Sequence, residues 1–187
     1  MNLSANSGGL LATKVSNFQG LFDYMKNHHD IKASNLVKIL DDFPEMALQN
    51  RRHLLRNKFD LIRKEQPQRK SPYIRNLFMR HPDLFMTSYA SMEAKASYLK
   101  RNLNRPIHKE GAFPLLLLYS YTDVVWPRCE LLVASGERAF NLAEVLSCSD
   151  EEFCGKFGFA VETLDAKKRE RKQIEEKDRM WNYVPAI

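Results

Sequence analysis

The sequence is poor in glycine, in cysteine and in long apolar runs. Only 7 of its 187 residues are glycine and only 3 are cysteine. Apolar runs such as Leu115–Leu118 fall far short of the ~20 residues that a membrane-spanning helix needs. An odd, small number of cysteines argues against a secreted disulfide scaffold and for a reducing compartment. With 44% hydrophobic and 28% charged residues, the composition excludes collagen-like and wholly disordered chains.

The proportions of the larger apolar residues favour helices over strands. The chain has 23 leucines, against 19 valines, isoleucines and threonines together. Leucine is a good helix former, whereas the β-branched residues are enriched in strands. The sequence therefore predicts a mostly helical protein.

Positive charge is concentrated in the middle of the chain. Residues 51–128 contain 16 Lys and Arg but only 6 Asp and Glu, a net charge of +10. The segments before and after it have net charges of −1 and −3. Clustered cations bind polyanions by releasing the counterions condensed on them. A solvated face of a helical array explains the same charge equally well, and charge alone does not separate the two.

Three segments align without gaps around a proline. They are Phe43–Asn50, His81–Ser88 and Phe113–Ser120. In each, Met or Leu follows the proline at the second and fourth positions, and Asn or Ser follows at the sixth. The prolines are 38 and 32 residues apart, a spacing typical of stacked repeat units.

Each segment predicts two helices with a short turn between them. The proline ends the first helix, because proline cannot continue the hydrogen-bond ladder. Ser34 caps the start of this helix in the first segment, and Ser71 caps it in the second. The residues after it form a 3₁₀ turn that inserts apolar side chains into the core. Asn50, Ser88 or Ser120 then caps the second helix. Leu115–Leu118 also fits a buried strand, but Glu45 and Asp83 in the matching places favour the helical interpretation.

The predicted organisation has three parts. Residues 1–33 form an N-terminal segment with a partial repeat, and residues 34–146 form the three repeats. Residues 147–187 form a capping helix, opened by a capping box of Ser149 and Glu152, and a charged tail. In that tail we expect neighbouring acids to offset Lys167 and Lys168.

The proline-led units resemble those of the mitochondrial transcription termination factor (mTERF) family. The segments from Pro82 to Leu99 and from Pro114 to Leu131, with Pro127-Arg128, carry the resemblance. It implies an all-α fold: a curved, right-handed α-solenoid whose units each contain two helices and a short 3₁₀ helix. Since family members usually have more repeats, the chain resembles a short member or a C-terminal portion. The resemblance also implies a mitochondrial location, although the start of this sequence has no clear transit peptide.

Cations recur at equivalent places on the predicted second helices. Lys58, Lys95 and Arg128 lie seven or eight residues after the caps, and Arg63 and Arg101 lie thirteen after. Equivalent positions line one surface in a solenoid, so such a column would follow a phosphate backbone. The predicted nucleic-acid-binding residues are Arg56, Lys58, Arg63, Lys95, Lys100, Arg101 and Arg128.

The sequence carries no P-loop, no dinucleotide-binding glycine motif and no nucleophile elbow. His28-His29-Asp30 has no further ligands at metal spacing, so we expect a surface role for it and predict no metal site or cofactor. The leading hypothesis is a non-enzymatic protein that binds double-stranded DNA or structured RNA and regulates mitochondrial transcription or its termination. The alternative is an adaptor in rRNA modification or ribosome assembly, which binds a protein partner through the C-terminal tail. Neither hypothesis includes a membrane or a small-molecule substrate.

Overall fold

The computed structural model describes residues 19–44, 46, 52–105, 110 and 113–182 of the chain. Every element of regular structure in this described part is helical, which confirms the predicted fold class. The chain forms two compact units, Met1–Glu93 and Ala94–Ile187. Among the described residues, no helix has the length and apolar character needed to cross a membrane.

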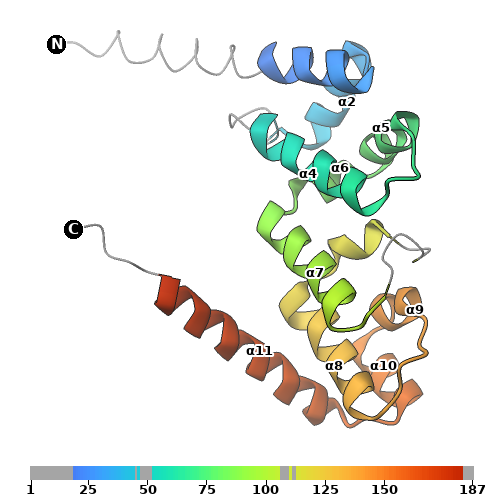
Figure 1. Ribbon diagram of the computed structural model, residues 1–187, viewed down its shortest axis with the longest axis vertical. Coiled ribbons are helices and arrows are strands. Elements are labelled where there is room, and N and C mark those ends of the chain that lie inside the picture. Colours follow the sequence, from blue (N-terminus) through green and yellow to red (C-terminus); the bar gives the residue numbers. More distant parts are fainter. Residues whose placement is uncertain (1–18, 45, 47–51, 106–109, 111–112, 183–187) are drawn as a thin grey trace, which may run out of the picture. The chain divides into compact units, whose positions relative to one another are not determined.

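The first unit opens with a helix over residues 19–29 (Figure 1). It continues with α2 (Ala33–Asp42), α4 (Arg52–Glu65), α5 (Ser71–Arg80) and α6 (Pro82–Met86). The helix α7 (Tyr89–Arg101) begins in the first unit and ends in the second. The second unit then contains the 3₁₀ helix η2 (Leu115–Leu118), the π-helical turn η3 (Tyr121–Val125), α8 (Trp126–Ala134), α9 (Leu142–Ser147), α10 (Asp150–Phe157) and α11 (Val161–Asn182).

The short helices after the prolines bury the apolar side chain at the second position after the proline, as the repeat predicts, whereas at the fourth position Met86 is partly buried and Leu118 is 37% exposed. Leu84 in α6 and Leu116 in η2 are fully buried, and Met46 in the first copy is 1% exposed. The run Leu115–Leu118 is helical, so the strand interpretation is wrong. In α6 the same insertion is made by a single α-helical turn rather than by a 3₁₀ turn.

Three of the predicted caps are confirmed and two are wrong. Ser88 Oγ accepts a hydrogen bond from Ser91 N at 3.2 Å, and Ser120 Oγ accepts one from Asp123 N at 3.1 Å. Ser34 and Ser71 instead lie inside the first turns of α2 and α5, which start after Lys32 and Lys70 without a side-chain cap. The capping box of Ser149 and Glu152 is present, and Asn50 lies outside the described residues.

A π-helical turn, η3, precedes α8 in the third repeat. Pro127 has no N–H to donate to the preceding turn, and Trp126 N bonds five residues back to Tyr121 O. Val125 is fully buried, whereas its neighbour Val124 is only partly buried. Leu131, further along in α8, also lies in the core.

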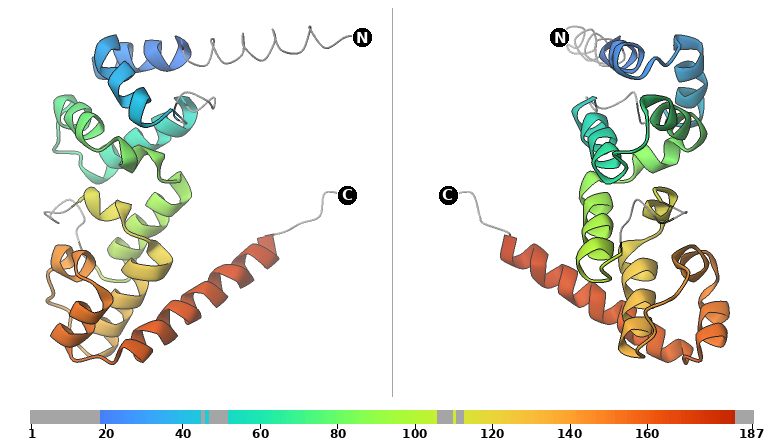
Figure 2. Two further views of the ribbon diagram at one scale, coloured as in Figure 1. Left: turned by 180° about the vertical axis from the view of Figure 1, so that it is seen from behind. Right: turned by 45° about the vertical axis from the view of Figure 1, so that its right-hand side comes forward.

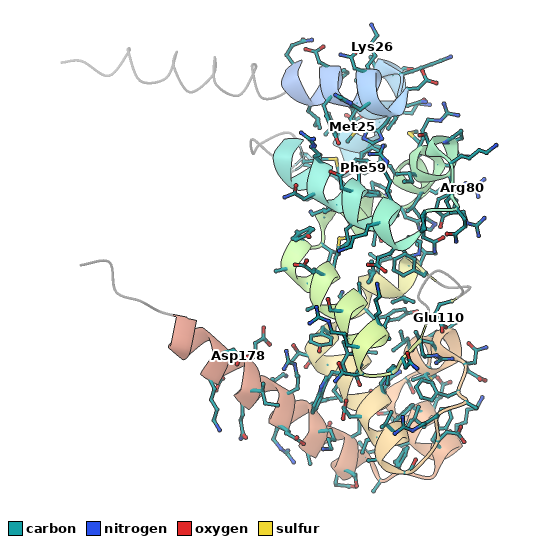
Figure 3. All side chains as sticks on the ribbon, viewed as in Figure 1. Met25, Lys26, Phe59, Arg80, Glu110 and Asp178 are labelled. Carbon is teal, nitrogen blue, oxygen red and sulfur yellow. The ribbon has the colours of Figure 1, made fainter. Side chains whose placement is uncertain are left out.

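The core of the first unit is largely aromatic. Phe59 of α4 is tilted against Phe85 of α6, with ring centroids 4.6 Å apart, and Phe78 of α5 meets Phe85 edge to face at 5.0 Å. Phe59 and Met25, both labelled in Figure 3, are fully buried. These contacts join the helix over residues 19–29 and the elements α4, α5 and α6 within one hydrophobic core.

Candidate nucleic-acid interface

The structure buries three of the predicted nucleic-acid-binding cations. Lys58, Lys95 and Arg128 are 3%, 1% and 3% exposed. The prediction that these three form an exposed column is therefore wrong, because buried side chains cannot reach a phosphate backbone. We refer to Lys58, Lys95 and Arg128 as the buried cations.

Each buried cation binds backbone carbonyls of the short helix that follows along the chain. Lys58 Nζ donates to Phe85 O in α6. Lys95 Nζ donates to Leu117 O in η2 and, at 2.8 Å, to Tyr119 O. Arg128 donates to Val145 O at 2.7 Å and to Cys148 O at 2.9 Å, at the end of α9. The last carbonyls of a helix have no partner within it and carry partial negative charge, so a cation there is favourable.

The ion pair of Arg128 and the burial of Lys95 agree with a structural role for the buried cations. Arg128 also pairs with Asp150 at 2.7 Å. Burial alone would raise the pKa of Asp150, but hydrogen bonds from Lys168 and Arg128 outweigh it and hold the pKa below its ordinary value. Burial lowers the pKa of Lys95 to about 8. The three positions are equivalent, but the cations there do not face solvent. Each joins its helix to a short helix further along the chain, within the same compact unit.

The sequence contains a signal for this burial that the cation count missed. Each cation stands inside an apolar stripe of residues i, i+3, i+4 and i+7, where it takes the i+3 place. All three stripes are buried. They are Leu55-Lys58-Phe59-Ile62, Met92-Lys95-Ala96-Leu99 and Val125-Arg128-Cys129-Leu132.

The other predicted cations lie at the surface. Arg56 and Arg63 are on α4, with 68% and 39% of their side chains exposed. Lys100 and Arg101 are exposed in the last turn of α7. Cations in a last turn also stabilise the helix through its dipole, so this placement is compatible with a structural role as well.

A groove joins Arg56 and Arg63 to the helix over residues 19–29. It has a volume of about 490 Å³. We call it the Tyr24 groove, and it is lined by Gly20, Asp23, Tyr24, Asn27, His28, Arg56, Asp60 and Arg63. Asp60 lies between the two arginines on α4, at 3.7 Å from Arg56 and 3.3 Å from Arg63. It holds both guanidinium groups beside the groove.

Two aromatic side chains of the helix over residues 19–29 also line the Tyr24 groove. Tyr24 and His28 are one helical turn apart, and their ring centroids are 5.0 Å apart. Burial and the charge of Asp60 raise the pKa of Tyr24, while Arg63 and Arg56 act in the opposite direction. Tyr24, Asn27 and Asp60 could not be predicted from the sequence, because their meeting depends on how two helices pack.

A second and a third hollow adjoin the Tyr24 groove and add further cations. One shares His28 with it and includes Arg75, which pairs with Asp30 at 2.8 Å. The other shares Arg63 with it and includes Arg69 and Lys70. The exposed surface of the first unit therefore presents several guanidinium and ammonium groups around three neighbouring hollows.

His29 lies behind the groove, so the predicted surface role is wrong for this residue. It is 5% exposed, stacks on Phe59 at 3.9 Å and shares a 3.2 Å hydrogen bond with the Tyr24 hydroxyl. Burial lowers its pKa to about 4, with Arg63 and His28 adding to the shift and Asp60 opposing it. Within the described residues, no three His, Cys, Asp or Glu side chains form a metal-binding group.

We expect the first unit to lose stability on mild acidification. An unfolded histidine titrates near pH 6.5, so between about pH 6.5 and 4 the unfolded chain binds the proton more tightly than folded His29. The contribution of His29 to the free energy of unfolding is therefore complete above this window and is lost as the pH falls through it. By pH 5 the loss is on the order of 1 kcal/mol. Urea denaturation at pH 7 and pH 5, followed by circular dichroism, measures the difference. His29→Phe should reduce this pH dependence and His28→Phe should retain it; an identical dependence in all three proteins would contradict the assignment.

The fold defines a helical-repeat protein, in which the short buried helix α6 lies between the longer helices α5 and α7. The model of the mTERF family matches residues 9–154, and the chain belongs to that family. Proteins of this family are generally nucleic-acid-binding rather than enzymatic, and they are mostly mitochondrial or organellar. Searches of curated proteins and of solved structures returned no match.

Proposed function

We propose that this chain binds double-stranded DNA or structured RNA in mitochondria and thereby regulates transcription or its termination. Family membership supports the nucleic acid as ligand and the organelle as location. The net charge of +10 over residues 51–128 supports a polyanionic ligand, even without the buried cations.

The observation that carries the proposal is the arrangement of Arg56, Asp60 and Arg63 along the Tyr24 groove. Two guanidinium groups stand two helical turns apart on one face of α4, and one carboxylate holds both. Guanidinium groups bind phosphate oxygens through two parallel hydrogen bonds. A phosphate that enters would replace Asp60 as the partner of each arginine, at little cost because exposed ion pairs are weak. These contacts fix orientation but read no sequence.

The second unit contributes a separate pair of cations, Lys100 and Arg101. Lys100 occupies the place on α7 that Arg63 occupies on α4, directly after the last residue of the buried apolar stripe. Arg105, further along, is already committed to the fold, since it pairs with Glu110 at 3.0 Å and donates to Phe140 O at 2.8 Å. The proposed phosphate-binding residues are therefore Arg56, Arg63, Lys100 and Arg101.

The double variant Arg56→Gln/Arg63→Gln is expected to bind more weakly to unrelated sequences alike. It should also flatten the slope of log affinity against log salt by about 2 units, since each lost phosphate contact removes about one. Asp60→Asn should have the opposite effect and strengthen binding, because it removes a negative charge that competes with phosphate. Fluorescence anisotropy with a 20-base-pair DNA duplex and an RNA hairpin, at several salt concentrations, measures both effects.

Lys38→Gln provides the control for this experiment. Lys38 is an exposed cation of α2 outside the Tyr24 groove, so its variant should keep the wild-type slope. An unchanged slope in the double variant would place the site elsewhere. If the wild type bound neither probe, the proposal would fail and the adaptor hypothesis would take its place.

A further inference from the structure

The last helix, α11, carries the densest group of cations in the chain. Five of the six residues from 167 to 172 are basic, and only Glu170 is acidic. We call the five the α11 cluster: Lys167, Lys168, Arg169, Arg171 and Lys172. The sequence alone predicts a segment of mixed charge, in which neighbouring acids offset Lys167 and Lys168. In the structure α11 packs against α8, η3 and α10 of the second unit (Figure 2).

Two members of the α11 cluster lie over aromatic rings. Arg171 stands 4.7 Å from the ring centroid of Tyr121 and 6.0 Å from that of Trp126, and Lys167 stands 5.8 Å from Trp126. Both cations therefore interact with the negative faces of the rings. Burial raises the pKa of Tyr121 and the charge of Arg171 opposes that shift.

Two further members are held by carboxylates of the repeat. Lys172 pairs with Asp123 at 2.8 Å, and this bond lowers the pKa of Asp123. Lys168 pairs with Asp150, the residue that also binds Arg128. Thr122 Oγ1 adds a hydrogen bond to Glu175 at 2.9 Å. Four of the five cations thus have an aromatic or acidic partner in the same unit.

Apolar contact contributes little to this docking. Leu164, near the start of α11, is fully buried, but no residue from 165 to 178 is. Lys172 and Asp123 keep 56% and 47% of their side chains exposed. Ion pairs this exposed are individually weak and are screened by salt. Apart from Leu164 and the less exposed pair of Lys168 and Asp150, therefore, α11 is held by contacts that a competing polyanion can replace.

The face that α11 covers corresponds to the proposed phosphate-binding face of α4. Trp126 lies six residues after the cap Ser120, as Arg56 lies six residues after Asn50. At this place α4 has its own exposed cation, whereas the third repeat has an aromatic ring that collects cations from α11. The charge that the third repeat lacks at this place is therefore supplied by α11.

We propose that the α11 cluster is a second phosphate-binding surface, held on the last repeat until a nucleic-acid backbone competes for its cations. This inference rests on the proposed function, because the competing ligand is the same nucleic acid. Phosphates take over Lys167, Arg171 and Lys172 from Trp126, Tyr121 and Asp123. The segment after Leu164 then leaves η3 and α8, and Trp126 becomes accessible to water.

The fluorescence of Trp126 reports the release directly. In a Trp181→Phe background, Trp126 is the single tryptophan of the chain, and acrylamide quenching measures its exposure. Adding the DNA duplex or the RNA hairpin should increase the quenching constant. Asp123→Asn should bind the same probe roughly two- to fivefold more tightly, because it removes one competing ion pair. Lys167→Gln/Arg171→Gln/Lys172→Gln should flatten the salt slope by about 2–3 units.

Lys177→Gln is the matched control on the same helix. Lys177 is an exposed cation flanked by Glu176 and Asp178, so its variant should change neither the quenching nor the slope (Asp178 is labelled in Figure 3). If nucleic acid bound without changing Trp126 quenching, and the triple variant kept its slope, the inference would be overturned while an effect of Arg56 and Arg63 upheld the proposed function. If the wild type bound neither probe, both would be overturned.

Discussion

Arg128→Met is expected to lower the free energy of unfolding by about 3–5 kcal/mol, the cost of removing one partner from a buried charge network. Methionine keeps most of the side-chain length but has no N–H group. The carbonyls of Val145 and Cys148 would then lose their donor, and Asp150 would lose one of its two cations. Because these groups lie at the end of α9, the variant should loosen the contact between α8 and α9. Thermal unfolding followed by circular dichroism measures the loss.

Arg138→Met is the matched control for this variant. Arg138 is exposed and lies in the connection between α8 and α9, so the same chemical change should shift the melting temperature little. The shift in melting temperature of Arg128→Lys should lie between those of the two Met variants. Lysine retains the charge but lacks the planar guanidinium group that reaches two carbonyls and a carboxylate. Equal, small shifts for Arg128→Met and Arg138→Met would show that the buried cation is not needed for stability.

Leu116→Ala is expected to lower the free energy of unfolding by about 2–5 kcal/mol, the range found when a fully buried leucine is replaced by alanine. Leu116 is 0% exposed at the second position after Pro114, where the repeat places an apolar side chain in every copy. Leu118, two residues further in η2, is 37% exposed. Leu118→Ala removes the same atoms from the same short helix and should cost clearly less. Urea denaturation of the two variants gives both values, and equal values would contradict the inserted position of Leu116.

The order and type of the helices could be predicted because local signals determine them. Pro44 and Pro82 follow α2 and α5, and Ser88 and Ser120 cap the next helices. The prolines and side-chain oxygens act on the backbone within a few residues, so a pattern in the sequence contains the whole cause. Ser34 and Ser71 were wrong as caps because serine also fits a first helical turn, one position or more inside the start.

The candidate site could be predicted only in part, because it depends on how helices pack. Repetition correctly identified Lys58, Lys95 and Arg128 as equivalent, but equivalence does not decide whether a position faces solvent or a neighbouring helix. The carbonyls that bind these cations are 17 to 27 residues further along the chain. Tyr24 and Asp60 meet in the same way across two helices. Such contacts leave only a weak trace in the sequence, here a charged residue within an apolar stripe.

The buried cations give the repeats a direction. In each pair the earlier repeat supplies the donor and the later one the carbonyls, so neighbours are joined head to tail and each junction has two unlike sides. Lys156 occupies the corresponding place on α10, seven residues after the cap Ser149, as Lys95 lies seven after Ser88. There, however, α11 follows in place of another short helix, and Lys156 remains half exposed and pairs with Glu144. A chimera should therefore join at this end only if its next repeat offers free carbonyls to Lys156.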